Sequence, residues 1–358
     1  MTPIAAQWKR HMSCRHRKAN ITAAAVLALA ALFIARAAAA AAVLGLAALF
    51  IARAGAAADK YPVRPVTLIV PFPAGGGVDA VARIVADKLA AALGQPFVID
   101  NRGGAAGVIG MRMAARAAAD GYTLVLAHTG STSINPSLYA NPGYDPRVDF
   151  APIGLISSTP VVLMAHPSFA AQSIAELIAM ARKEPGKINF GTPPPGTGGY
   201  LAAELFKSMS GADMTIIPYK GTAALTTDLL GGHVPVGFNV IAPAMGSLRG
   251  GSLRVIAVAG PTRSSLFPEV PTVDESGLPG FEAVLHYGLL APAGTPKEII
   301  VRVNKELRAL VASADVRERI AADGGDPLPS SPEQYAADID REEAKWSALI
   351  KKLNLKVE

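Results

Sequence analysis

Beyond about residue 60, short and nearly continuous apolar runs alternate with stretches of helical periodicity. The first runs, rich in Val, Ile and Leu, cover residues 66–70, 97–99 and 122–127. Strands that do not alternate apolar with polar residues are buried on both faces, which is typical of parallel sheets covered by helices. Residues 79–93 repeat apolar positions at helical spacing and stop at Gly94. The pattern predicts an α/β fold built from βαβ units.

A second series of strands and helices predicts a second lobe. Its apolar runs cover residues 187–190, 214–217, 235–240 and 253–259. The run 151–165, broken by Pro152 and Pro160, separates the two series, and the chain returns at residues 287–292 before two long helices. We expect two α/β lobes, each a mainly parallel sheet flanked by helices. Lobe 1 comprises residues 59–162 with 287–358, and lobe 2 comprises residues 163–286.

Capping residues mark three helix starts. They are Ser173 with Glu176, Thr295 with Glu298 and with Pro296 at the first helical position, and Ser331 with Pro332. The last helix carries an apolar stripe that we expect to pack against lobe 1, formed by Tyr335, Ile339, Trp346 and Ile350.

The first 58 residues differ in composition from the rest and predict a secretory signal peptide. They hold seven cations and no acid, so the net charge of +6 arises in this leader, and residues 59–358 carry 27 cations against 28 acids. A basic stretch, a long Ala/Leu run and small residues up to Ala58 follow in the order of such a signal. The apolar core is duplicated, because residues 24–37 recur as residues 41–54 with one difference. We expect cleavage near Ala58, or else at Ala54, and a periplasmic protein.

Alternatives for the leader are an uncleaved membrane anchor and a true start at Met12. Arg36 divides the apolar segment into pieces of 15 and 16 residues, each shorter than the roughly 20 residues that span a bilayer. The only cysteine, Cys14, lies before the apolar core. Cleavage therefore leaves no thiol for disulfides, cysteine catalysis or thiolate metal sites.

Four loops rich in small residues directly follow predicted strands: residues 71–79, 128–133, 191–199 and 218–222. The carboxyl ends of parallel strands form a ligand crevice, so two loops from each lobe face one another across a cleft. Glycine lets backbone N–H groups approach a ligand, and a helix N-terminus adds about half a positive charge. An anion, particularly a carboxylate, suits such a cleft. Lys220 is the one cation within these loops, whereas Asp79 is expected to cap its own helix.

Motifs of other function classes are missing from the sequence. The glycines 75–77 do not fit the dinucleotide fingerprint, residues 191–199 lack the Lys-Ser/Thr of a P-loop, and no nucleophile elbow, zinc-protease motif or calcium loop occurs. We therefore expect no cofactor, no metal and no nucleic-acid partner. An enzyme on the same fold remains an alternative, with Ser131 or Thr197 as the nucleophile and His128 as the base, although a packed or hydrogen-bonded role for His128 is favoured.

Six motifs carry a family resemblance through residues 60–358: YPVRP (61–65), IVPFPAGGGVD (69–79), NRGGAAG (101–107), DGYTL (120–124), PYKG with DLLGG (218–221 and 228–232) and GLLAPAGTP (288–296). They resemble the Bug family, the extracytoplasmic solute receptors of tripartite tricarboxylate transporters. The resemblance implies a two-lobed periplasmic binding protein of the Venus-flytrap type, type II-like. It would be a monomer without catalytic activity that closes on a small organic carboxylate and delivers it to an integral membrane permease. A receptor for a signalling partner is the alternative.

In this family the loops matching residues 71–79, 129–131, 191–199 and 218–221 line the cleft. The ligand-binding residues predicted on this basis are Phe72, Ala74, Gly75, Gly76, Gly77, Asp79, Thr129, Gly130, Ser131, Gly191, Thr192, Pro193, Thr197, Gly198, Tyr200, Pro218, Tyr219, Lys220, Gly221 and Asn239.

The third loop departs from the family pattern, which reads like GTPGNGTSGH. Pro194 and Pro195 replace Gly-Asn, Gly198 replaces Ser, and Tyr200 replaces His, while Asn239 stands where an acid is usual. Proline has no N–H to donate, so the loop is stiffer and offers fewer hydrogen bonds. We expect a less highly charged ligand, such as an aromatic or short-chain monocarboxylate.

Overall fold

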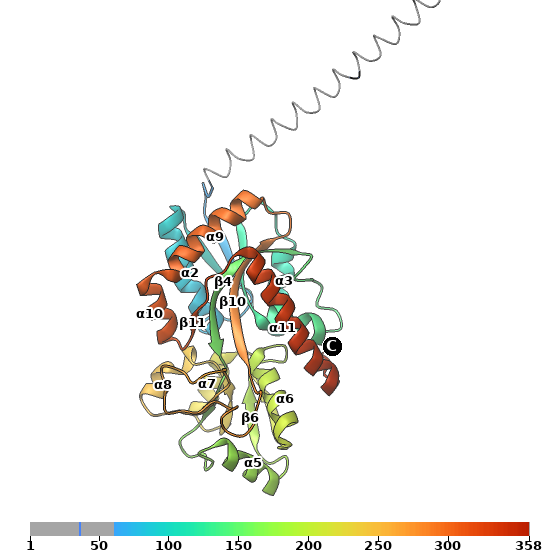
Figure 1. Ribbon diagram of the computed structural model, residues 1–358, viewed down its shortest axis with the longest axis vertical. Helices are drawn as coiled ribbons and strands as arrows, with labels where there is room; N and C mark the ends of the chain where they lie inside the picture. Colours follow the sequence, from blue (N-terminus) through green and yellow to red (C-terminus); the bar gives the residue numbers. More distant parts are fainter. Residues whose placement is uncertain (1–35, 37–60, 358) are drawn as a thin grey trace, which may run out of the picture. The chain divides into compact units, whose positions relative to one another are not determined.

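The computed structural model describes residues 36 and 61–357 (Figure 1), and the latter range lies within one unit, Tyr61–Glu358. The predicted signal peptide, its cleavage position and Met12 lie outside the described residues, apart from Arg36. Across the described range, no helix combines the length and the apolar character that a membrane crossing requires. Two sheets, each flanked by helices, organise residues 61–357.

The first sheet has six strands in the order β11-β4-β10-β3-β1-β2. Their bounds are β1 Val66–Val70, β2 Phe97–Asn101, β3 Thr123–His128, β4 Phe150–Pro160, β10 Val284–Pro292 and β11 Asp326–Pro327. Strand β1 runs parallel to β2 and β3, whereas β10 runs antiparallel to β3 and β4, and β11 is antiparallel to β4.

The second sheet has five strands in the order β7-β6-β8-β5-β9. They are β5 Val162–Ala165, β6 Asn189–Thr192, β7 Thr215–Pro218, β8 Val236–Asn239 and β9 Arg254–Val258. Strand β6 is parallel to β7 and β8, and β5 is antiparallel to β8 and β9.

The two-lobed α/β fold is confirmed, but both sheets are mixed and not mainly parallel. A continuous apolar run reports burial on both faces and not strand direction, so the sequence pattern could not show that β5 and β10 run against their neighbours. The strands that lead into three of the four predicted loops, β1, β6 and β7, pair only in parallel. Sheet membership changes between β4 and β5, close to the predicted lobe boundary, and β10 leads the chain back to the first sheet.

Helices cover both sheets (Figure 1). Those associated with the first sheet are α2 Gly77–Leu93, α3 Val108–Ala115, α4 Asn135–Leu138, α9 Lys297–Ala312, α10 Ala314–Ala322 and α11 Pro332–Leu353; the others are α5 Ile174–Lys183, α6 Gly198–Ser210, α7 Thr222–Leu230 and α8 Met245–Arg249. The predicted helix 79–93 is thus two residues longer at its start.

Of the three helix starts predicted at Ser173, Thr295 and Ser331, two are confirmed as caps. Ser331 and Gln334 form a capping box on α11, and the Ser173 side chain accepts a hydrogen bond from the Glu176 N–H. Thr295 is not a cap, because α9 begins at Lys297 with Pro296 as its N-cap residue. The Thr295 hydroxyl instead donates to the Pro292 carbonyl at 2.7 Å.

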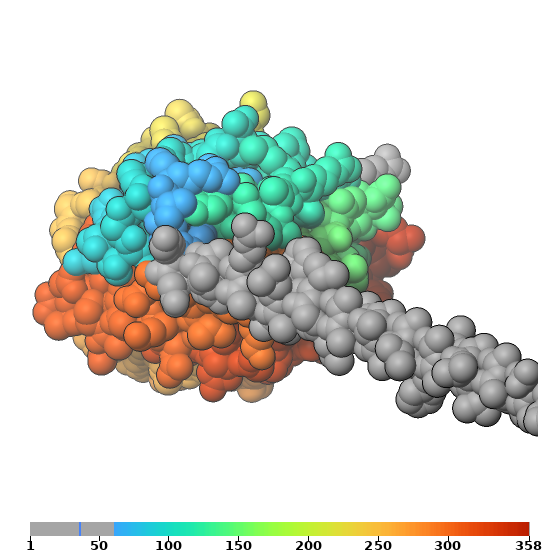
Figure 2. Space-filling view, turned by 90° about the horizontal axis from the view of Figure 1, so that it is seen from above, coloured from blue at the N-terminus to red at the C-terminus, as the bar shows by residue number. Residues whose placement is uncertain are grey.

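Lobe 1 is assembled from both ends of the described range. Figure 2 shows the blue-to-teal N-terminal residues beside the orange C-terminal helices, and an ion pair joins Lys88 of α2 to Asp315 of α10. The predicted stripe on α11 is buried, with Trp346 only 1 % exposed. Burial of this stripe fixes the last helix against the first sheet.

Candidate functional site

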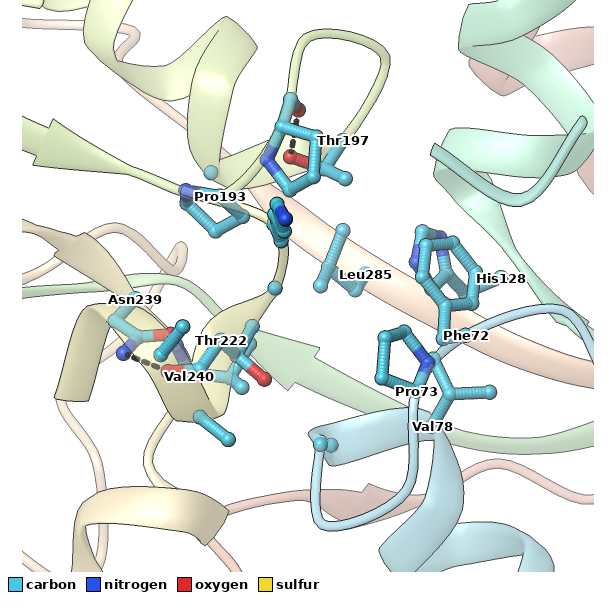
Figure 3. A pocket seen from close by; sticks show the side chains of 18 of the residues that line it. Phe72, Pro73, Val78, His128, Pro193, Thr197, Thr222, Asn239, Val240 and Leu285 are labelled. Atoms are coloured by element: carbon cyan, nitrogen blue, oxygen red, sulfur yellow. Dashed lines mark hydrogen bonds between the residues drawn. The ribbon is translucent and has the colours of Figure 1, made fainter. Parts of the chain in front are cut away.

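A cavity of about 350 Å³ lies between the two sheets and takes its lining from both lobes (Figure 3). The first sheet and its loops contribute Phe72, Pro73, Ala74, Gly76, Gly77, Val78, His128, Leu285 and Tyr287; the second lobe contributes Pro193, Pro194, Thr197, Gly199, Lys220, Gly221, Thr222, Ala223, Ala224, Asn239 and Val240. Leu285 belongs to the first sheet because it lies on β10. Most of these side chains are apolar. Lys220 is the one charged side chain among these lining residues, all of which belong to the described range 61–357.

The N-terminus of α2 faces this cavity. Its N-cap residue is Gly76, which has an extended backbone and makes no side-chain cap. The N–H groups in the first turn of a helix have no acceptor within the helix. Gly77 and Val78 line the cavity, so their N–H groups are available to a ligand there. They supply the positive end of a 17-residue helix.

Asp79 does not cap α2 as predicted, because the N-cap residue is Gly76 and no side chain caps this helix. Asp79 instead stabilises the preceding loop. Its carboxylate accepts hydrogen bonds from the Gly75 N–H at 3.0 Å, from Arg83 Nε at 2.9 Å and from Asn101 Nδ2 at 3.1 Å. Burial raises the pKa of this carboxyl, but these donors outweigh burial and the pKa is lowered overall. The side chain is therefore occupied in shaping the Pro73–Gly76 turn and does not line the cavity.

A second helix N-terminus, that of α7, faces the cavity from the other lobe. Gly221 is its N-cap residue, again without a side-chain cap. Thr222, Ala223 and Ala224 in its first turn all line the cavity. The two N-termini are close together, because a Cβ atom placed on Gly76 would lie 3.1 Å from Thr222 Oγ1.

Asn239 fixes the position of α7. Its Nδ2 donates to the Thr222 carbonyl at 3.1 Å and to Thr226 Oγ1 at 3.0 Å, and its Oδ1 accepts from the Val240 N–H at 2.9 Å. The bond to Thr222 is drawn in Figure 3. Asn239 lines the cavity, yet its amide is used within the protein.

The proline-rich loop before α6 closes another side of the cavity. Thr197 caps α6 by accepting from the Tyr200 N–H and donates to the Pro194 carbonyl at 2.7 Å. Across the lobes, Tyr139 Oη donates to the Pro195 carbonyl at 3.3 Å. The loop thus rests on lobe 1 and presents the rings of Pro193 and Pro194 to the cavity.

His128 and Tyr287 form part of the wall contributed by the first sheet. They are paired residues on β3 and β10, with ring centroids 5.8 Å apart, and Phe72 stacks on His128 at 4.6 Å. Burial lowers the pKa of His128 to about 4, so the imidazole is neutral at neutral pH. The Gly130 N–H donates to Nδ1 at 2.8 Å, which places the ring proton on Nε2.

Neither Ser131 nor Thr197, the nucleophiles of the enzymatic alternative, is hydrogen-bonded to the His128 ring. Ser131 Oγ donates to the His128 backbone carbonyl at 3.0 Å and not to the ring, and the Thr197 hydroxyl donates to Pro194. Activation of a hydroxyl requires a base within hydrogen-bonding reach of it.

The sequence-predicted site residues divide into two groups. Those that line the cavity are Phe72, Ala74, Gly76, Gly77, Pro193, Thr197, Lys220, Gly221 and Asn239. The others are not among the lining residues, and as ligand contacts they stay predictions: Gly75, Asp79, Thr129, Gly130, Ser131, Gly191, Thr192, Gly198, Tyr200, Pro218 and Tyr219. Some have other partners; Thr129 Oγ1 accepts from the His286 N–H at 2.9 Å, and Tyr219 Oη donates to Asp228 at 2.8 Å.

The other lining residues are not among the individually predicted ligand contacts: Pro73, Val78, His128, Pro194, Gly199, Thr222, Ala223, Ala224, Val240, Leu285 and Tyr287. Six of them lie within the four predicted cleft loops: Pro73, Val78, His128, Pro194, Gly199 and Thr222. One signal could have found several of them. Residues in the first turn of a helix that follows a glycine loop face the same way as the loop, which points to Val78 and to residues 222–224.

A cluster of possible metal ligands, His286, Asp338 and Glu342, has ligand atoms within 4.8 Å of one another. Its carboxylates already have partners, since His286 Nδ1 and Arg341 contact Asp338 and Trp346 Nε1 donates to Glu342 at 3.1 Å. None of these residues lines the cavity. We interpret the cluster as a hydrogen-bonded ion-pair network that joins α11 to β10.

Comparison with protein families matches residues 81–355 to the tripartite tricarboxylate transporter family receptor. Protein BugT of Bordetella pertussis is 37 % identical over 301 residues, covering 84 % of this chain and 92 % of that protein. The structure of R. palustris Rpa4515 with adipate matches with a TM-score of 0.80 at 35 % identity, over 83 % of this chain and 99 % of that one. MatC (Rpa3494) from Rhodopseudomonas palustris with bound malate matches with a TM-score of 0.76 at 32 % identity, over 81 % and 100 %. The resemblance noted in the loop motifs is confirmed, and this chain belongs to the tripartite tricarboxylate transporter receptor family.

Proposed function

We propose that this protein is a solute receptor that captures a small organic carboxylate in the cavity between its lobes and delivers it to a membrane permease. One observation carries the proposal: the N-termini of α2 and α7, from opposite lobes and without side-chain caps, face the same cavity. A carboxylate between them accepts N–H hydrogen bonds from both lobes and lies at two positive helix ends.

This arrangement couples binding to closure of the lobes. One carboxylate oxygen can bond to the first turn of α2 and the other to the first turn of α7, so the ligand bridges the two lobes. Hydrogen bonds to a charged group contribute about 1.5–3 kcal/mol each. Attraction of the anion is local, because residues 59–358 carry nearly balanced charge.

Relatives support a carboxylate as the ligand. The structures of Rpa4515 and MatC contain adipate and malate respectively. Both ligands are small carboxylates, although their polar groups differ, which is consistent with carboxylate capture by shared backbone groups and specificity set by other residues. We propose that this protein needs no cofactor or metal, acts as a monomer and catalyses no reaction.

We further propose that residues 1–58 direct the protein to the periplasm and are removed there. Structures of related receptors are described as periplasmic. N-terminal sequencing of the protein recovered from the periplasmic fraction of an expressing bacterium should begin near Asp59. Retention of Met1 or Met12 in a membrane fraction would instead support the uncleaved anchor.

A thermal-shift screen against mono-, di- and tricarboxylates tests the receptor function. A ligand present at 100 times its dissociation constant stabilises the folded state by about 2.7 kcal/mol. For a folded unit of this size, that corresponds to a rise of roughly 5 °C in Tm. No shift with any carboxylate would refute the proposal.

A further inference from the structure

The side of the cavity formed by β3 carries a buried hydrogen-bond donor with no partner among residues 61–357. His128 is 3 % exposed and lines the cavity. Its Nδ1 is taken by the Gly130 N–H. Within residues 61–357, the ring's other nitrogen, Nε2, makes no hydrogen bond. This nitrogen is not fully shielded by surrounding protein atoms. A neutral N–H therefore remains for a group inside the cavity.

This donor lies across the cavity from α7. Figure 3 shows His128 and Phe72 on one side and Thr222 on the other, with Leu285 between them. The surfaces near the middle are apolar, formed by side chains such as Leu285, Val240 and Pro193. A ligand whose carboxylate sits at the helix N-termini would extend an apolar body toward His128.

We propose that the ligand has a single carboxylate and an uncharged hydrogen-bond acceptor at its other end, and that the Nε2–H of His128 selects it by donating to that acceptor. This inference rests on the receptor function proposed above and names its ligand class. Keto, ester and ether oxygens are acceptors of this kind.

A second carboxylate at this end would be poorly compensated. Among residues 61–357, no charged side chain lines the cavity on the His128 side, because Lys220, the one charged lining residue in this range, comes from the loop before α7. Moving a carboxylate out of water without a counter-charge costs several kcal/mol, whereas a carbonyl loses much less and recovers it through one hydrogen bond. The pairing of a neutral donor with a neutral acceptor therefore discriminates against dicarboxylates.

Two sets of shape-matched acids test this ligand class by isothermal titration calorimetry on the purified protein. The longer set is adipate, 6-oxoheptanoate and heptanoate; the shorter is succinate, 4-oxopentanoate and pentanoate. Within a set the far end changes from carboxylate to methyl ketone to alkyl while the first carboxylate is kept. In the set that fits, we expect the keto acid to bind about 3- to 10-fold more tightly than the alkyl acid and at least about tenfold more tightly than the dicarboxylate.

Variants identify the donor. His128→Asn keeps an oxygen where Nδ1 accepts from Gly130 but removes Nε2–H, so the preference for keto acid over alkyl acid should fall to about one. His128→Gln can place an amide N–H near the Nε2 position and should retain part of the preference. His233→Asn is the matched control, because it makes the same change at an exposed histidine outside the cavity lining, and it should keep the wild-type ratio.

The outcomes separate this inference from the receptor function. A dicarboxylate that binds most tightly, or equal affinities for keto and alkyl acids in both sets, would overturn the inference and leave the receptor function standing. Absence of binding by all six acids would overturn the inference. The receptor function would be refuted only if, in addition, no acid of the wider carboxylate screen raised the Tm. The affinity ratios between keto acid, alkyl acid and dicarboxylate in the wild-type protein already decide whether the inference holds. The test therefore does not depend on whether the His128 variants fold.

Discussion

Replacing Thr222 by proline removes one of the N–H groups that we assign to the ligand carboxylate. Thr222 is the first residue of α7, where proline is well tolerated because this N–H has no acceptor within the helix. The preceding residue, Gly221, has φ 175° and ψ 173°, which is the extended backbone required before proline. The carbonyl of Thr222, which accepts from Asn239, is unchanged by the substitution.

The expected effect follows from one hydrogen bond to a charged group. Its loss costs about 1.5–3 kcal/mol, which is roughly a 10- to 150-fold rise in Kd. Thr222→Ala is the matched control, since it also removes the hydroxyl but keeps the N–H. The free energy of unfolding without ligand should differ between the two variants by less than about 1 kcal/mol.

Calorimetric titration of both variants with the tightest-binding acid of the two shape-matched sets provides the assay, and urea unfolding provides the stability control. Equal affinities for the Thr222→Pro and Thr222→Ala proteins would show that the N–H is not used, and the proposed bridge between the helix N-termini would then be wrong.

Three further effects are expected. Burial lowers the pKa of His128 to about 4 in the folded protein, whereas the pKa is about 6.5 in the unfolded chain. Between these two pH values the unfolded chain binds an extra proton, so the free energy of unfolding should fall by about 3 kcal/mol from pH 6.5 to pH 4. An unchanged pH dependence of Tm in His128→Asn would contradict this. Asp79→Ala leaves three donors without their acceptor and should lower the free energy of unfolding by about 2–4 kcal/mol in urea, whereas Asp87→Ala, on the exposed face of the same helix, should change it by less than about 0.5 kcal/mol. Ser331→Ala removes the bond to the Gln334 N–H and should cost about 1 kcal/mol; no change in the urea midpoint would exclude a stabilising capping box.

Most of the strands could be predicted from the sequence because buried runs of Val, Ile and Leu mark them directly. The runs at 66–70 and 253–259 match β1 and β9 to within a residue at each end. Strand direction could not be predicted, since it depends on which strand lies alongside. The failed cap at Thr295 has a local cause: its hydroxyl reaches back to Pro292, and the helix begins after Pro296.

The sequence predicts which loops form the candidate site, but only some of the side chains that line it. Phe72, Lys220 and the glycines 76 and 77 line the cavity as expected. Tyr219 stands in the right loop, but its hydroxyl turns away to Asp228. Position in a loop fixes where the backbone lies and leaves the direction of each side chain to tertiary contacts.

The pairing of His128 with Tyr287 was not visible in the sequence. It depends on the antiparallel register of β3 with β10, two strands far apart in the chain. His128 was expected to be packed or hydrogen-bonded; it is both, through Phe72 and Gly130, and it also lines the cavity. Its lowered pKa arises from burial in the folded structure, so no local sequence signal predicts it.

A crystal structure of the protein with the acid that binds most tightly tests the central claim most directly. We predict carboxylate oxygens within about 3.2 Å of backbone N–H groups in the first turns of both α2 and α7, which would place the anion between Gly77 and Thr222. A carboxylate held by only one lobe, or bound outside this cavity, would contradict the proposal that the ligand joins the two lobes through their helix N-termini.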